Sequence, residues 1–256
     1  MSKQRAFELK THGGARKGAG RPAKGPRPSE PHKKRPHLPP AQPVHVTIRL
    51  APDIARISLR RRDMFAAIRA ATITAARRDD FHIVHISVQA THVHLIIEAA
   101  SRTALARGMQ SFEISAARHL NRAVGARVGM RRTGTVFPDR YHPRILNSPR
   151  SVRNAIAYVL NNWRHHGEHA RAFARRWRID PFSSGWSFSG WKHLERAALL
   201  PQVPASYRPL WTWLPETWLL STGWRRHGLI RCDELPGRDQ RGSPRSHRHA
   251  IRSVAP

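Results

Sequence analysis

The chain has almost no cysteine, no long apolar run and no apolar segment near its N-terminus. The single cysteine, Cys232, excludes a disulfide-stapled secreted module and any zinc or iron–sulfur site built on several cysteines. No apolar run reaches the roughly 18 residues that a membrane-spanning helix needs. Because the N-terminus also lacks the apolar core of a signal peptide, we expect a cytoplasmic protein.

Acidic residues are also scarce. The 256 residues include 16 Asp and Glu against 46 Lys and Arg, which gives a net charge of +30. An excess of this size needs a polyanionic partner. We therefore expect nucleic acid to bind, ahead of an anionic membrane surface, and we expect no membrane partner.

The N-terminal segment differs in composition from the rest. Residues 1–43 are rich in Lys, Arg, Pro and Gly, so they cannot bury enough apolar surface to offset the entropy of ordering, and we predict disorder. Gly20-Arg21-Pro22 resembles an AT-hook, in which Arg21 would enter a minor groove. The plainer alternative, a solvated basic tail, is favoured because such short matches are common. The expected organisation is a basic leader at 1–43, a globular domain at 44–170, a Trp-rich extension at 171–234 and a basic tail at 235–256.

The hydrophobic pattern after residue 43 predicts strand, helix, strand, strand, helix, strand and helix, in that order. The first six elements have the order of a split βαβ, or ferredoxin-like, α+β fold with an antiparallel sheet and one face free of helices. The last helix would lie across or beside that free face. Past residue 175 we expect a mostly helical extension made of short helices. The expected strands span 44–50, 81–89, 92–98 and 141–146, and the expected helices span about 62–78, about 103–124 and a stretch that begins at 149.

The triplet His92-Val93-His94 is the sharpest local feature. On a strand, residues two apart share a face, so both imidazoles point the same way and can bind one metal ion. With 17 histidines in the chain, about one such triplet is expected by chance, and His247-Arg248-His249 is a second one. The apolar opposite face of the 92–98 strand favours a metal site more than the spacing alone does.

The helix that begins at 149 offers complementary groups. Tyr158 and Asn162 are four residues apart and share a face at the flank of its apolar stripe. Asn162 carries an amide oxygen that suits a metal ion, and Tyr158 carries a phenol that can act as a nucleophile. Taken alone, a boundary tyrosine and a helix-ending asparagine are the simpler interpretation.

Taken together, the motifs resemble the REP-associated tyrosine transposases, which belong to the one-tyrosine HUH single-strand transposases of the insertion sequence 200 type. The resemblance covers roughly residues 44–170. It is carried by His92-Val93-His94, Phe137-Pro138-Asp139-Arg140-Tyr141-His142 and Tyr158-Val159-Leu160-Asn161-Asn162, and Asp180-Pro181-Phe182-Ser183-Ser184 is also similar.

This resemblance implies a function. It implies a single-stranded DNA endonuclease and strand transferase, acting on hairpin DNA, with Tyr158 as the nucleophile that forms a 5′-phosphotyrosine. It also implies that His92, His94 and Asn162 hold Mg²⁺ or Mn²⁺. Trp163 stands where the family commonly has proline. The resemblance leaves open whether the chain is a monomer or a homodimer, and whether the tyrosine serves its own subunit.

Other residues keep more than one interpretation. Tyr141 is the rival nucleophile, although a role in stacking on bases fits its neighbours better. Glu98 is either an acceptor for an imidazole or a solvated strand end. The arginines that we expect to line the path of DNA are Arg118, Arg122, Arg131, Arg132, Arg140 and Arg144.

Two other functions remain as alternatives. One is a non-catalytic, domesticated nucleic-acid-binding protein. The other is a zinc hydrolase built on His85, His92 and His94, which would leave Tyr158 and Asn162 without a role.

Overall fold

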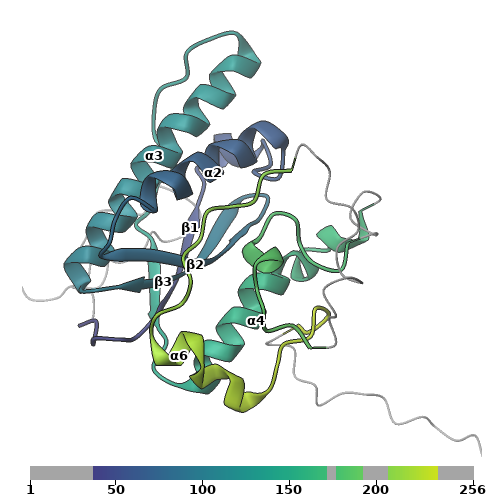
Figure 1. Cartoon of the computed structure of the whole chain (residues 1–256). Coiled ribbons are helices and arrows are strands. Elements are labelled where there is room, and N and C mark those ends of the chain that lie inside the picture. Colours follow the sequence, from purple (N-terminus) through teal and green to yellow (C-terminus); the bar gives the residue numbers. More distant parts are fainter. Residues whose placement is uncertain (1–36, 172–176, 193–206, 236–256) are drawn as a thin grey trace, which may run out of the picture. The chain divides into compact units, whose positions relative to one another are not determined.

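The computed structural model describes residues 37–171, 177–192 and 207–235 (Figure 1). The leader up to residue 36, with Arg21 and the AT-hook-like triplet, and the tail from residue 236 lie outside these ranges. Among the described helices, none is both long enough and apolar enough to cross a membrane.

Four antiparallel strands form one sheet in the order β2-β3-β1-β4. The central strand β1 pairs with β3 on one side and with β4 on the other, and β2 and β3 form a hairpin. This is the order of a ferredoxin-like fold, so the expected α+β class is confirmed. The strands are β1 (Val44–Arg49), β2 (Phe81–Val88), β3 (His92–Ala99) and β4 (His142–Ile145).

Two helices cover one face of the sheet, α2 (Arg62–Ala75) and α3 (Arg102–Val128) (Figure 1). They pack on each other and on a core formed by the alternate apolar residues of β1, β2 and β3. The sequence pattern did not predict α1 (Pro52–Ala55), because a single turn is too short to show a period. The main apolar core therefore lies between the sheet and these two helices.

A further helix, α4 (Pro149–His165), packs on the opposite face of the sheet. It begins as predicted: the Ser148 hydroxyl accepts from the Ser151 backbone N–H, and Pro149 occupies the first helical position. Trp163 is fully buried and the helix continues to His165, so tryptophan at this position does not end the helix. The expected placement of the last helix on the open face is confirmed.

The described part of the extension is less helical than expected, because irregular chain separates its helices. The helices near the end of the extension pack against α4, in a cluster that buries Trp191, Trp224 and Ile230. The Asn161 side chain donates to the Arg231 carbonyl, which ties the extension to α4. The helices after α4 are η1 (Glu168–Ala170), η2 (Ser184–Trp186), α6 (Trp218–Ser221) and η3 (Gly223–His227).

The segment 180–184 covers the free edge of strand β2. The Val88 N–H donates to the Phe182 carbonyl over 2.8 Å, and the Ile86 N–H donates to the Ser184 hydroxyl over 3.0 Å. An uncovered edge strand is prone to pair with other chains, so this segment closes the sheet on that side.

The folded region begins earlier than residue 44, where the sequence pattern placed it. Leu38 is buried in the main core, and the Pro43 carbonyl accepts from the Leu146 N–H at the other edge of the sheet. A lone leucine in a Pro-rich stretch carries no periodic signal, so the sequence pattern could not assign it to the core.

Candidate active site

Polar side chains gather on the face of the sheet that α4 covers. The register pairs Thr47 with His94 and Arg49 with His92, so these four side chains share that face. The ring centres of His92 and His94 are 4.8 Å apart. The ring of Tyr158, from α4, is centred 5.2 Å from that of His94. The structure therefore brings together three of the residues that the sequence singled out.

His94 is held so that one ring nitrogen is free. Its Nδ1 lies 3.0 Å from the Thr47 hydroxyl and 3.2 Å from Nε2 of His45, while its Nε2 is buried and has no hydrogen-bond partner in the described chain. A proton on Nδ1 donated to either neighbour leaves the Nε2 lone pair available. Metal-binding histidines are commonly oriented in this way.

Both imidazoles of the triplet are held in the neutral form. Burial, followed by the neighbouring His92 and His45, lowers the pKa of His94 to about 2. Burial, followed by His166 and Arg49, lowers the pKa of His92 to about 4. A neutral imidazole keeps the lone pair that a metal ion needs.

Asn162 lies one turn after Tyr158 on α4 and is fully buried. Neither its amide oxygen nor its amide nitrogen has a hydrogen-bond partner among the residues that the structure describes. Because a buried amide without partners is costly, Asn162 is a candidate for binding a ligand.

The donor set fits a metal ion only if an amide takes part. Across the described ranges, no group of three or more His, Cys, Asp or Glu side chains could hold a metal ion. A third protein ligand would have to be of another type, and the amide oxygen of Asn162 is one that Mg²⁺ and Mn²⁺ accept. By the type of atom that they offer, His92, His94 and Asn162 would suit such an ion.

Three further histidines lie at the site, and the sequence did not single them out. The ring of His45 is centred 5.9 Å from that of Tyr158, and burial, followed by Arg144 and His142, lowers its pKa to about 4. His165 ends α4 and His166 follows it, and their ring centres lie 5.5 Å from that of Tyr158 and 5.1 Å from that of His92, respectively. The polar positions of β1 were a usable signal, but only the β1–β3 register shows that they face His94.

Tyr141 is misplaced by the sequence interpretation. Its side chain belongs to the main core and is only 6% exposed, so it is available neither as a nucleophile nor for stacking on bases. A tyrosine between an arginine and a histidine resembles an exposed residue. Here the chain turns the ring inward, where its area adds to the apolar core.

Glu98 and His85 also have structural roles. The Glu98 carboxylate accepts from the N–H groups of Glu216 and Thr217 and from the Thr217 hydroxyl. It therefore fixes the start of α6 and is neither an acceptor for an imidazole nor solvated. His85 is buried with its ring edge-on to Phe188, at 5.4 Å between centres, and does not join the other two histidines of the proposed zinc site.

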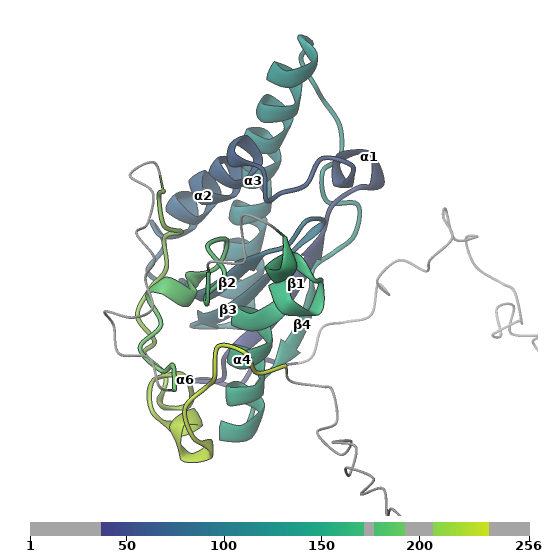
Figure 2. The same ribbon diagram turned by 90° about the vertical axis from the view of Figure 1, so that its right-hand side faces the viewer.

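The predicted DNA-contacting arginines fall into separate groups. Four of them line a concavity of about 820 Å³ at the C-terminal end of α3, which projects beyond α2 (Figure 2). One of the four also binds within the protein, since Arg132 contacts Asn121 and, at 2.6 Å, Asp53. Arg140 is exposed, and Arg144 is exposed on β4 opposite His45. The four at α3 are Arg118, Arg122, Arg131 and Arg132.

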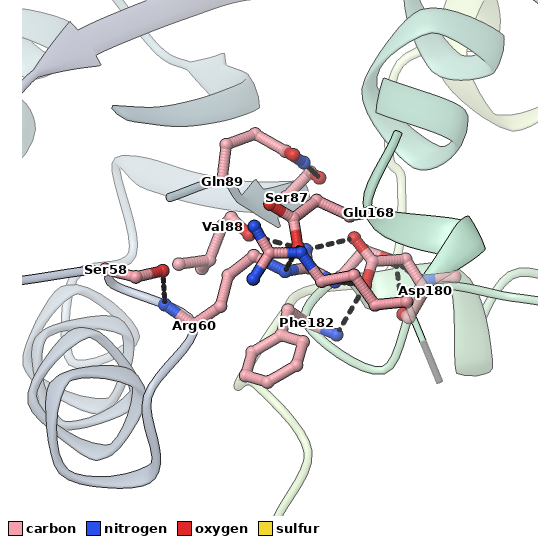
Figure 3. A network of polar contacts seen from close by, with 11 residues as sticks. Ser58, Arg60, Ser87, Val88, Gln89, Glu168, Asp180 and Phe182 are labelled. Atoms are coloured by element: carbon pink, nitrogen blue, oxygen red, sulfur yellow. Dashed lines mark hydrogen bonds and ion pairs between the residues drawn. The ribbon is translucent and has the colours of Figure 1, made fainter. Parts of the chain in front are cut away.

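A buried ion cluster connects the end of α4 to the edge of the sheet (Figure 3). Both terminal nitrogens of Arg60 donate to the Asp180 carboxylate, over 2.9 and 2.7 Å, and one also donates to the Val88 carbonyl over 3.0 Å. Glu168, just after α4, lies 3.7 Å from Nε of Arg60. The cluster thus joins the chain after α4 and the start of segment 180–184 to the end of β2.

Comparison with known proteins finds one family. A family model described as "Transposase IS200 like" matches residues 47–162. A search of curated proteins finds no match. One similar solved structure is a REP-associated tyrosine transposase bound to a REP hairpin, with 16% identity and a TM-score of 0.47, over 73% of this chain and 93% of that one. Another is a bacterial tRNA(His) guanylyltransferase-like protein in complex with GTP, with 14% identity and a TM-score of 0.38, over 53% of this chain and 71% of that one.

Proposed function

Residues 47–162 belong to the IS200-like transposase family, and from this premise we propose that the chain cleaves and joins single-stranded DNA with Tyr158 as its nucleophile. The observation that carries the proposal is that the Tyr158 phenol lies close to His94 and His92. The ring centres of Tyr158 and His94 are 5.2 Å apart, and those of His94 and His92 are 4.8 Å apart.

The reaction is a transesterification at a phosphodiester. The phenol oxygen of Tyr158 forms a bond to phosphorus, the bond from phosphorus to the 3′ oxygen breaks, and the phenol proton leaves while the 3′ oxygen gains one. The product is a 5′-phosphotyrosine and a free 3′-hydroxyl. Because one phosphoester replaces another, attack by a 3′-hydroxyl reverses the step and joins strands.

We propose that His92, His94 and Asn162 hold Mg²⁺ or Mn²⁺ beside the nucleophile. Such an ion, when bound, would withdraw charge from the phosphate and so ease attack by an oxygen nucleophile. The chain's own contribution is orientation: Thr47 and His45 fix the His94 ring, and α4 carries Tyr158 and Asn162 one turn apart.

The proposed partner is DNA folded into a hairpin with unpaired flanks. A net charge of +30 supports binding to a polyanion, and folded single strands present both a shape and unpaired bases to a protein. The four arginines at the end of α3 and the exposed Arg144 beside the active site are the proposed phosphate contacts.

Replacing the nucleophile tests the chemistry. Purified protein is incubated with fold-back oligonucleotides and Mn²⁺, and covalent adducts are sought on denaturing gels. Tyr158→Phe should abolish adducts while binding falls by less than about threefold, because only one hydroxyl is removed. Adducts that persist in this variant would show that another residue attacks the DNA.

A non-catalytic binding protein is the competing function. In that case the wild-type chain would bind the same oligonucleotides and form no adduct at any Mn²⁺ concentration. The unpartnered amide of Asn162 and the free Nε2 of His94 favour catalysis, since binding alone gives neither group a purpose.

The geometry also bears on whether a subunit acts alone. Tyr158 and His94 come together within one chain, which supports a tyrosine that serves its own subunit. Mixing Tyr158→Phe with His94→Ala should then give no adduct. If the mixture recovers activity, the tyrosine works on a neighbouring copy and the protein is a functional dimer.

A further inference from the structure

A second cavity lies away from the active site, between α2 and the extension, with a volume of about 650 Å³. We propose that it binds one unpaired nucleotide of the DNA strand. This inference rests on the proposed function only in taking DNA as the substrate, and the family model stops at residue 162, before the extension that forms one wall. The residues that carry the argument are Phe65, Trp177, Phe182, Tyr207, Arg62 and Arg208.

The walls of the cavity are aromatic. Phe65 comes from α2, while Trp177, Phe182 and Tyr207 come from the extension. Aromatic side chains give a flat surface on which any base can stack, and such stacking is the usual basis for binding unpaired nucleotides. A paired base has its faces covered by its neighbours in the helix, so this cavity selects an unstacked one.

The charge of the cavity suits a phosphate. Arg62 and Arg208 are exposed at its lining, and none of the described residues that line it is acidic. Asp180, the acidic group that acts on Tyr207, has its charge offset by the bidentate contact with Arg60. An anionic nucleotide therefore meets aromatic rings together with exposed arginine side chains.

One wall of the cavity is rigid before any ligand binds. The guanidinium of Arg60 lies 4.3 Å from the centre of the Phe182 ring, and Phe65 meets that ring edge-on at 5.0 Å. Figure 3 shows Arg60 between Phe182 and its partners Asp180 and Glu168. A preformed wall avoids the entropy cost of ordering an aromatic side chain on binding.

Tyr207 adds a polar group to the cavity. Its hydroxyl is buried and has no hydrogen-bond partner in the described part of the chain. Burial and the nearby Asp180 carboxylate raise its pKa, so the hydroxyl keeps its proton. A protonated hydroxyl can donate to a base or a phosphate, which would satisfy it.

The cavity and the active site adjoin the same hairpin end. Arg60, which lines the cavity, donates to the Val88 carbonyl at the end of β2. The neighbouring Leu59 N–H donates to the Ala90 carbonyl, in the turn that leads to His92. A strand cleaved beside His92 can therefore continue around this edge of the sheet to the cavity.

Stacking in the cavity can be read directly with a fluorescent base. The probe is a thymidine strand of about ten nucleotides with one central 2-aminopurine, whose fluorescence falls when it stacks on an aromatic ring. With the full chain in EDTA, binding should quench the probe. Trp177→Ala should remove most of the quenching and weaken binding about tenfold, which corresponds to the loss of one stacked base.

Matched variants separate the cavity from general effects. Trp211→Ala removes an exposed tryptophan of the same extension that does not line the cavity, and it should leave quenching unchanged. Arg62→Gln should reduce the slope of log affinity against log salt by about 0.7, the loss of one phosphate contact to a single strand. Tyr207→Phe keeps the ring and removes only the hydroxyl, so it should weaken binding less than Trp177→Ala does. Because this variant leaves the packing of the ring intact, weaker binding would not be due to a disturbed fold.

The outcomes distinguish this inference from the proposed function. Quenching and affinity that are the same in wild type and Trp177→Ala would overturn the nucleotide cavity, even if Tyr158 adducts form normally. Quenching that depends on Trp177 in a protein that forms no adduct would support the cavity and refute the proposed chemistry. A loss of affinity on Trp177→Ala that is equally large for a strand made entirely of abasic residues would also overturn the cavity, because that strand has no base to stack.

Discussion

Thr47 shows how much a single residue contributes to the proposed site. Its hydroxyl is one of two partners that fix Nδ1 of His94. Thr47→Val keeps the shape and removes that contact, so we expect the Mn²⁺ concentration for half-maximal adduct formation to rise about tenfold or more. High Mn²⁺ should restore the rate, because the nucleophile is untouched.

The control for this prediction is Thr103→Val, at an exposed threonine near the start of α3. That variant should show the wild-type Mn²⁺ dependence. An unchanged half-maximal concentration in Thr47→Val would mean that His94 needs no help from the threonine, or that it is not a ligand.

The sequence identified some residues of the site and missed others for a physical reason. His92, His94, Tyr158 and Asn162 were predicted because each pair is close in sequence and shares a face of one strand or one helix. His45 belongs to another strand, so only the pairing register could place it. The roles of all these residues as ligands and nucleophile stay predictions.

At the scale of elements, Glu98 is the clearest anchor. Its carboxylate holds the start of α6 through three hydrogen bonds and is 5% exposed. Glu98→Gln removes the charge and one acceptor, and we expect the free energy of unfolding in urea to fall by about 2 kcal/mol. Glu216→Gln, at a neighbouring and mostly exposed carboxylate, should cost less than about 1 kcal/mol. Equal losses in the two variants would contradict the anchoring role.

The elements were predictable where one face is buried along the whole length. The three long helices and the strands β1, β2 and β3 follow from their apolar patterns, whereas β4 has no buried residue and was expected only as an extended stretch. α3 runs to Val128, four residues past the expected end. The apolar pattern could not show this last turn, because the turn projects beyond the core and Val128 is 60% exposed. The turns of the extension lack a period and are set by tertiary contacts such as Trp213 stacked on His82, with ring centres 4.2 Å apart.

For the whole molecule, buried histidines couple stability to pH. Burial lowers the pKa of His85 from 6.5 to about 4, and His45, His92 and His94 are lowered in the same direction. Between pH 6.5 and 4 the unfolded chain binds protons that the folded chain excludes. As far as these histidines are concerned, the free energy of unfolding should therefore be highest above pH 6.5 and should fall as the pH drops toward 4.

His85→Leu removes one of the protons that the unfolded chain binds in this range, at a residue away from the proposed metal ligands. Urea titrations across this pH range should give a slope smaller by about 1.4 kcal/mol per pH unit than in the parent chain. A slope equal to that of the parent would mean that His85 becomes protonated in the folded protein.

The Arg60 cluster determines how far a shortened version of this protein must extend toward the C-terminus. The family match ends at residue 162, yet the guanidinium of Arg60 is matched by a carboxylate at residue 180. A protein trimmed to the matched region would lose Asp180 together with the segment 180–184, so Arg60 and the edge of β2 would both become exposed. Minimal domains for crystallography or genome engineering should therefore extend at least through Ser184, so that the sheet edge stays sealed as well.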